Sequence, residues 1–310
     1  MFLRIRTIAL NAYRESVRAR ILLGLAGVAF AVSLFSIIIG SFTLTNGSRV
    51  VADIGAASIS LFSVAVCVVI GATSLHRELE QKTIFPILAR PLGRGEYVVG
   101  KFFGTLLTIA VFLAADTGVV LLLLAFLGER SPLLVIGLPM VLIVGLGIAA
   151  WRIPWARTYG PIPWALLMLA VGFFLADVAP AERRLVMTAS TLALLEVSIV
   201  TACATMLSSF SSPFLSALLT LGVWVIGRNT DSFDRFPKKF FGAAISESAK
   251  VLGKVWPNLQ VYVPRRPLLT GEAVDVDRTQ YLLMATGMSV AWSVVFLALA
   301  ILIFRKRDFL

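Results

Sequence analysis

Eight apolar stretches of about 20 residues dominate the sequence. A helix needs about 20 such residues to cross the roughly 30 Å hydrocarbon core of a bilayer. The stretches lie at 21–42, 54–75, 103–127, 133–151, 162–178, 186–208, 211–228 and 281–304. Because backbone polar groups must be satisfied internally in hydrocarbon, each is expected to be an α-helix. The sequence therefore predicts an all-α, polytopic transmembrane helical bundle with about eight spans.

The composition agrees with a membrane protein and excludes several other classes. The chain is 58% hydrophobic and only 15% charged, whereas soluble domains carry roughly 25% charged residues. Its net charge of +11 comes from Lys and Arg that flank apolar stretches, so we expect lipid contacts and no nucleic-acid binding. Cys67 and Cys203 lie inside apolar runs and His76 is the only histidine, which makes a disulfide or a metal site improbable.

The distribution of positive charge predicts the topology. An even number of spans puts both termini on one side. Basic residues concentrate at 4–20, 76–101 and 305–307, and we place these segments in the cytoplasm. The spans at 133–151 and 162–178 are crowded by prolines. They could instead form one broken or re-entrant element.

The segment before the first span is predicted to be a separate interfacial helix, residues 1–20, attached to a membrane domain at 21–310. Helical spacing puts the apolar and polar side chains of residues 5–18 on opposite sides. The alternative is a solvated leader. The apolar side chains are Ile5, Ile8, Ala9, Ala12 and Tyr13, and the polar ones are Arg4, Asn11, Arg14, Glu15 and Arg18.

The loop at 76–101 is the most informative polar segment. It mixes carboxylates and cations, which favours docking to a polar protein surface, although an ordinary solvated loop is also compatible. Gly95, Gly100 and Lys101 have the GxxxxGK spacing of a nucleotide-binding loop, but Phe102 stands where a Ser or Thr would bind magnesium. We expect no nucleotide site here and expect Lys101 to extend toward the lipid headgroups.

A second polar segment, 228–280, is predicted to lie outside the membrane. It combines charges with aromatic residues, which indicates short helices resting on the membrane surface. This segment is too short for a separate domain, but it offers a docking surface for an extracytoplasmic partner.

Asp116 and Glu196 fall within predicted spans, where an ionised carboxylate costs roughly 2.5–3.5 kcal/mol. We expect Asp116 to contact Thr117 or a backbone group on another span. For Glu196 we favour a structural or gating contact over substrate contact or a neutral side chain. Small residues in the spans are predicted to permit close helix packing, namely Gly24, Gly27, Gly145 and Gly147.

An ordered set of short motifs runs through the chain. It comprises Asp53-Ile-Gly55, Glu78-Leu-Glu80, Lys82-Thr83, Ala89-Arg90-Pro91, Arg94, Glu96-Tyr97, Gly100-Lys101-Phe102, Leu195-Glu196, Pro257-Asn258-Leu259 and Arg307-Asp308-Phe309. In order and spacing this set resembles the permeases of ABC transporters of type 2, an exporter family. The stretch from about 130 to 180 adds two apolar segments to the six-span family pattern, which suggests a six-span core with an inserted pair.

The resemblance implies a membrane subunit that pairs with itself or with a related permease and binds two ATPase subunits. ATP and Mg would be bound by those ATPases, and no cofactor by this chain. Within the loop at 76–101, the part around Glu78 to Arg94 would correspond to the coupling helix, and the location would be a bacterial or archaeal cytoplasmic membrane. The implied ATPase-coupling residues are Arg77, Glu78, Glu80, Lys82, Thr83, Arg90, Pro91, Arg94 and Glu96.

Three functions remain to be compared. The first is an ATP-driven exporter in which ATPase closure reorients spans 1, 2 and 6 to 8 around a dimer interface. The second is an ATPase-coupled mechanical or assembly module that passes force to an extracytoplasmic partner through 228–280. The third is an intramembrane enzyme using Glu196 or Asp116, which lacks a recognisable catalytic set.

Overall fold

The computed structural model describes residues 2–43, 46–74, 93–233, 253, 256–272 and 277–306, and within these ranges the chain forms helices and no β-strand. The predicted all-α fold class is confirmed. In chain order the elements are α1 (Phe2–Val17), α2 (Arg20–Ser41), α3 (Gly47–Ser74), α6 (Arg94–Leu127), α7 (Pro132–Arg152), α8 (Ala156–Tyr159), α9 (Pro161–Leu175), η1 (Ala176–Val178), α10 (Pro180–Ser208), α11 (Pro213–Arg228), α12 (Thr230–Phe233), η2 (Leu259–Tyr262), α14 (Arg266–Thr270) and α15 (Arg278–Lys306).

Seven helices in the described part of the chain are long and apolar enough to cross a membrane: α2, α3, α6, α7, α9 extended by η1, α10 and α15. The two proline-flanked segments both form such helices. Pro132 and Pro161 stand in the first turn of α7 and α9, where a missing N–H costs nothing. Pro139 lies inside α7, which nevertheless continues to Arg152. The predicted span at 211–228 is shorter than expected: α11 has 16 residues and is about 24 Å long.

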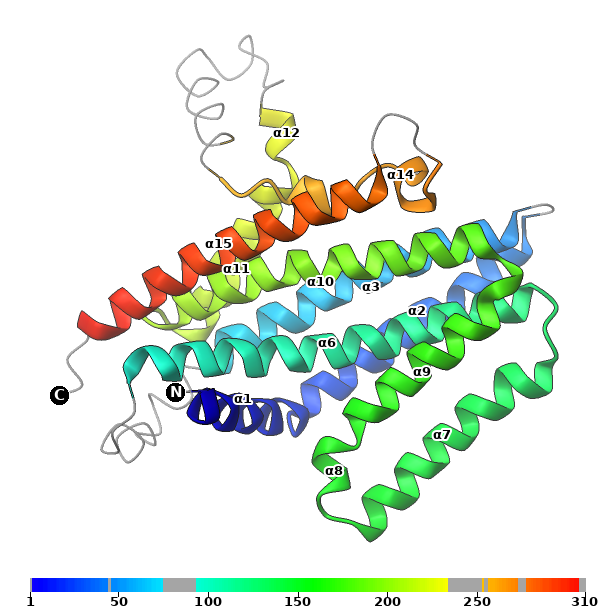
Figure 1. The fold of residues 1–310 in the computed structure, drawn as a ribbon, viewed down its shortest axis with the longest axis horizontal. Helices are drawn as coiled ribbons and strands as arrows, with labels where there is room; N and C mark the ends of the chain where they lie inside the picture. The colour runs from blue at the N-terminus through cyan, green and yellow to red at the C-terminus, as the bar shows by residue number, and fades with distance from the viewer. Residues whose placement is uncertain are drawn as a thin grey trace.

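Although α11 is short, the segment that connects the end of α10 to the start of α15 still passes from one end of the bundle toward the other. Figure 1 shows α1, the start of α6 and the end of α15 at one end of the bundle, and the starts of α10 and α15 toward the other. Because α10 ends where α15 also ends, the connection between them must return through the thickness of the bundle. The short α11 covers part of that distance, and residues 256–272 cover more of it on the outside of α10 and α3.

The most buried helices are α6 and α10. Of their most apolar windows, 78% and 67% are buried inside the molecule, against 6% for α7. The α7–α9 hairpin therefore lies at the edge of the bundle (Figure 1), where α9 packs on α6. At that crossing a Cβ on Gly118 would lie 2.8 Å from the backbone carbon of Met168. This arrangement agrees with a six-span core and an added pair.

The N-terminal helix is amphipathic as predicted, and it packs on the first half of α6. Ala12 and Tyr13 are buried, while Arg14 is exposed. The helices approach closely at Gly104, where a Cβ would lie 2.4 Å from the carbonyl oxygen of Ala9. Burial, and secondarily the neighbouring Tyr159, raises the pKa of Tyr13 to about 12, so its hydroxyl stays neutral.

Two sequence predictions about packing are wrong. Lys101 does not extend to the headgroups, because its side chain is 3% exposed and its Nζ lies 3.1 Å from the Glu15 carboxylate of α1. The four glycines expected at helix contacts, Gly24, Gly27, Gly145 and Gly147, have nothing within 4 Å of a Cβ position in the described part of the chain.

Candidate functional site: a buried polar clasp and its pocket

Glu196 lies in the middle of α10 and is completely buried. Its two oxygens accept hydrogen bonds from Arg228 Nε and Nη2, both at 2.7 Å, and from Trp224 Nε1 at 2.8 Å. Arg228 Nη2 also donates to Ser60 Oγ on α3 at 2.6 Å. These four residues join three helices, and we call them the polar clasp.

The local structure of α11 explains why Trp224 and Arg228 converge on one carboxylate. The two residues are four positions apart and therefore lie on one face of the helix. Arg228 stands in the last turn of α11, where a cation interacts favourably with the helix dipole. Its guanidinium carbon also lies 5.3 Å from the centre of the Trp224 ring, within the range of a cation–π contact.

The clasp makes a buried charge tolerable. An unpaired carboxylate at this depth would cost several kcal/mol of free energy. The bidentate pair with arginine offsets this cost, because it is the strongest hydrogen-bond geometry for a carboxylate. Arg228 is 21% exposed, since one side of it borders a pocket. The clasp is therefore a buried ion pair between Glu196 and Arg228, and its arginine borders one cavity.

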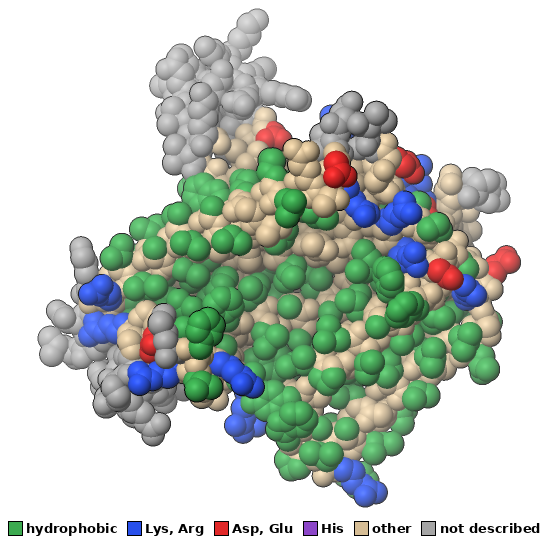
Figure 2. Space-filling model, viewed as in Figure 1, with side chains coloured by type: hydrophobic (Ala, Val, Ile, Leu, Met, Phe, Trp, Pro, Cys, Tyr) green, Lys and Arg blue, Asp and Glu red, His purple; other side chains and the backbone are tan. Residues whose placement is uncertain are grey.

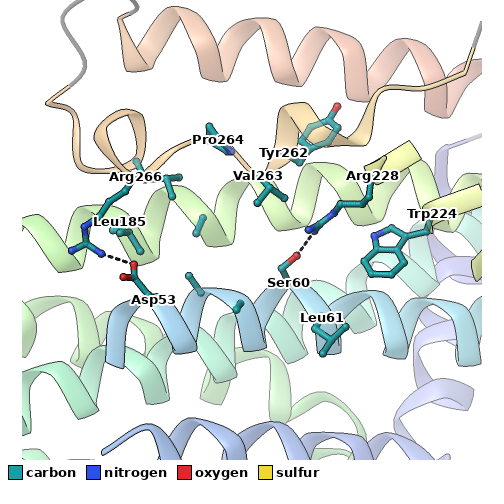
Figure 3. A pocket seen from close by; sticks show the side chains of 14 residues that line it. Asp53, Ser60, Leu61, Leu185, Trp224, Arg228, Tyr262, Val263, Pro264 and Arg266 are labelled. Carbon is teal, nitrogen blue, oxygen red and sulfur yellow. Dashed lines mark hydrogen bonds and ion pairs between the residues drawn. The ribbon is translucent and has the colours of Figure 1, made fainter. Parts of the chain in front are cut away.

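The pocket beside the clasp has a volume of about 350 Å³. Figure 3 shows Arg228 and Arg266 at its opposite ends, with Asp53 and Ser60 on α3. Its walls are otherwise mainly apolar. The lining residues are Asp53, Ala56, Ala57, Ser60, Leu61, Leu185, Ala189, Trp224, Arg228, Tyr262, Val263, Pro264, Arg266 and Leu269.

Residues 256–272, which we call the strap, cover the pocket from the outside. Arg266 forms ion pairs with Asp53 of α3 and with Glu182 of α10, the latter at 3.3 Å. At the other end of the pocket Tyr262 is buried and donates to the carbonyl of Ala285 at 3.0 Å. Burial raises the pKa of Tyr262, so this hydroxyl stays a neutral donor.

The strap also corrects the interpretation of the segment 228–280. Its described part does form short helices, η2 and α14, as predicted. These helices pack on the bundle, where Leu259 is fully buried. A Cβ on Gly227 would lie 2.7 Å from the Cγ of Leu259. The strap is thus an integral part of the pocket wall.

Asp116 belongs to a different place in the core. It is fully buried, and its Oδ1 accepts from Ser33 Oγ of α2 at 3.4 Å. Its Oδ2 has no hydrogen-bond partner among the described residues. The expected contact with Thr117 is not present, because that hydroxyl donates to Leu113 O and pairs with Ser190. Asp116 is not part of the clasp.

The predicted coupling residues fall into two groups. Arg94 and Glu96 lie at the start of α6, where Arg94 donates to the carbonyl of Arg305 at 2.8 Å. The Glu96 carboxylate accepts from the Gly93 N–H at 3.4 Å and lies 3.9 Å from Arg4, so these residues connect α6 with α1 and α15. The other seven, Arg77, Glu78, Glu80, Lys82, Thr83, Arg90 and Pro91, lie outside the described residues.

Sequence reasoning found one member of the clasp and missed three. Glu196 was visible because a carboxylate interrupts an apolar run. Ser60 and Trp224 carry no signal of their own within apolar spans. Arg228 ends the predicted span at 211–228, although its spacing of four from Trp224 at the end of an apolar run is a signal for a buried partner of a carboxylate.

Comparison with known protein families gives a match over most of the chain. Residues 6–228 match the family described as ABC-2 family transporter protein. No curated protein matches the chain. Among the described residues no three His, Cys, Asp or Glu side chains come together in a way that could hold a metal ion.

Proposed function

Because the chain belongs to the ABC-2 family and is the membrane permease of an ABC transporter, we propose that it couples ATP hydrolysis by separate ATPase subunits to the export of a substrate. The match over residues 6–228 carries the proposal. It includes α1 to α11, and therefore also the loop between α3 and α6.

The packing around that loop supports the transmission of movement from the loop to the clasp and the strap. The loop connects α3 and α6, and both helices pack against α10. On α3, Ser60 binds Arg228 of the clasp, and Asp53 binds Arg266 of the strap. A push on the loop that shifts α3 along α10 would strain both contacts, because each joins α3 to a different element. The clasp and the strap are in this proposal the contacts that distinguish the two states of the permease.

The partners follow from the same proposal. Two ATPase subunits bind ATP and Mg and dock on the loop at 76–101, and a second copy of the chain or a related permease completes the transporter. Such a subunit provides the path of the substrate and transmits the movement of the ATPases, and it performs no chemistry of its own. Glu196 fits this role, since all its hydrogen bonds are used in joining helices.

The charge distribution supports a cytoplasmic position for α1 and the end of α15. Basic side chains outnumber acidic ones at that end of the molecule, while the opposite end carries both signs (Figure 2). Positive charge concentrates on the cytoplasmic side of membrane proteins. The basic end includes Arg4, Arg6, Arg14, Arg18, Arg94 and Arg305, and the mixed end includes Arg130, Asp177, Glu182, Arg183, Arg266, Glu272 and Asp277.

The test is co-purification with a co-expressed ABC ATPase subunit from the same genome, followed by measurement of ATPase activity. The double variant Glu78→Lys/Glu80→Lys is expected to lose the ATPase, since it reverses two charges on the docking loop. The matched control is Glu272→Lys/Asp277→Lys, which makes the same charge change at the opposite end of the molecule. Retention of the ATPase and of transport by the loop variant would contradict the proposal.

A further inference from the structure

A second cavity, the side groove, lies between α1, α6, α10 and α15. Its volume is about 680 Å³. These four helices share one face of the bundle (Figure 1), and Figure 2 shows that hydrophobic side chains cover much of that face. The groove is lined by Arg6, Ala9, Leu10, Phe102, Phe103, Leu106, Leu107, Ala110, Leu194, Leu195, Ser198, Ser289, Val290, Ser293, Val294 and Leu297.

The walls of the side groove suit a hydrocarbon chain. The polar lining residues other than Arg6 are three serines, and their hydroxyls are already bonded. Ser198 Oγ lies 2.5 Å from Ser289 Oγ and 3.4 Å from Ser293 Oγ, and the Leu195 carbonyl oxygen lies 2.8 Å from the hydroxyls of both Ser198 and Ser289. An apolar occupant therefore leaves none of these hydroxyls unsatisfied.

The groove has a charged end and an apolar end. Arg6 is its only charged residue among the described residues that line it. It belongs to α1, which packs beside Gly100 and Gly104 near the start of α6. From Phe102 to Ala110 the wall follows α6 for about 12 Å into the bundle, and α15 contributes about the same length between Leu297 and Ser289. A ligand that fits has an anionic group at Arg6 and an apolar tail directed into the bundle.

We propose that the side groove binds an anionic phospholipid of the membrane leaflet that faces α1, with the phosphate at Arg6 and one acyl chain along α6 and α15. Basic residues at the ends of transmembrane helices attract anionic headgroups. A second copy of the chain fits less well. In a two-fold interface the same patch meets itself, and the described residues that line this patch contribute one cation and no carboxylate that could pair with it.

The experiment is lipid retention by the full-length protein in native mass spectrometry. Detergent-purified protein is incubated with equal amounts of dioleoyl phosphatidylglycerol and dioleoyl phosphatidylcholine, which share acyl chains and differ in headgroup charge. The expected preference for phosphatidylglycerol is about five-fold, the size of one basic residue's attraction to an anionic lipid surface. Arg6→Gln is expected to abolish the preference. Arg6→Lys and the exposed-site control Arg14→Gln should keep it.

The apolar part of the site is tested separately. Val290→Trp fills the inner end of the groove and is expected to lower retention of both lipids, whereas Val295→Trp, on an exposed part of α15 outside the lining, should not. Equal retention of the two lipids by the unmodified protein, or an unchanged preference in Arg6→Gln, overturns the proposal. A loss of dimers in Val290→Trp with unchanged lipid retention assigns the groove to a second copy and also overturns it. None of these outcomes depends on binding of an ATPase.

Discussion

Replacing Glu196 by glutamine removes the negative charge of the polar clasp and keeps nearly the same side-chain volume. The substitution leaves the Arg228 guanidinium without its counter-charge and turns an amide N–H₂ toward Arg228 or Trp224, whose N–H groups only donate. Removing one partner of a buried ion pair costs about 3–5 kcal/mol. Because Arg228 is 21% exposed to the pocket, water can satisfy part of it, and we expect the lower end, about 3 kcal/mol.

The converse variant Arg228→Met is expected to cost more, about 5 kcal/mol, because it leaves Glu196 fully buried without a counter-charge. The double variant Glu196→Gln/Arg228→Met contains no unpaired charge. It should therefore be more stable than the sum of the two single effects predicts, by at least about 2 kcal/mol.

Thermal unfolding in detergent measures these effects. A thiol-reactive dye reports the transition, because Cys67 and Cys203 are both buried and Cys67 lies 3.1 Å from Thr201, close to the clasp on α10. At about 2 °C for each kcal/mol, Glu196→Gln should lower Tm by about 6 °C.

The matched control is Asp177→Asn, which also changes a carboxylate to an amide in an arginine pair. Its ion pair with Arg130 is 42–48% exposed, so water screens it, and its loss should lower Tm much less than Glu196→Gln does. Equal shifts for Glu196→Gln and Asp177→Asn, or strictly additive effects in the double variant, would refute the reasoning that the clasp is a coupled buried pair.

Three further predictions use other parts of the structure. Gly104→Ala should destabilise the protein by about 1–3 kcal/mol in the same assay, because the new Cβ meets the Ala9 carbonyl. The control Gly145→Ala has open space around it and should change stability by no more than about 1 kcal/mol. Equal effects of the two substitutions would contradict the close packing of α1 on α6. Arg266→Gln should cost about 1 kcal/mol at low salt and less at high salt, because its ion pairs are partly exposed; a cost that does not change with salt would argue against a role of these ion pairs. N-ethylmaleimide should label neither Cys67 nor Cys203 before denaturation, as mass spectrometry can show, and labelling of the native protein would mean that the core opens.

The existence of most helices could be predicted from sequence because the requirement is local. A backbone in hydrocarbon must satisfy its own hydrogen bonds, so a long apolar stretch such as 103–127 becomes a helix wherever it packs. The amphipathic α1 and the buried position of Glu196 follow from equally local signals. The length of α11 did not follow, because the helix begins two residues inside the predicted span at 211–228, where Ser212 caps its first turn by accepting from the Leu215 N–H.

What the tertiary structure decided is which helix faces meet. In a bilayer every face of a span is apolar, so the hydrophobic effect does not select one face over another. Contacts such as Glu196 with Arg228, and Asp53 with Arg266 some 213 residues away, depend on the crossing of whole helices. The same reason explains why Gly104 lies at a close contact and Gly145 does not. The sequence by itself determined a polytopic helical membrane protein with the motifs of an ABC-2 permease, and the packing of its helices created the clasp, the pocket and the side groove.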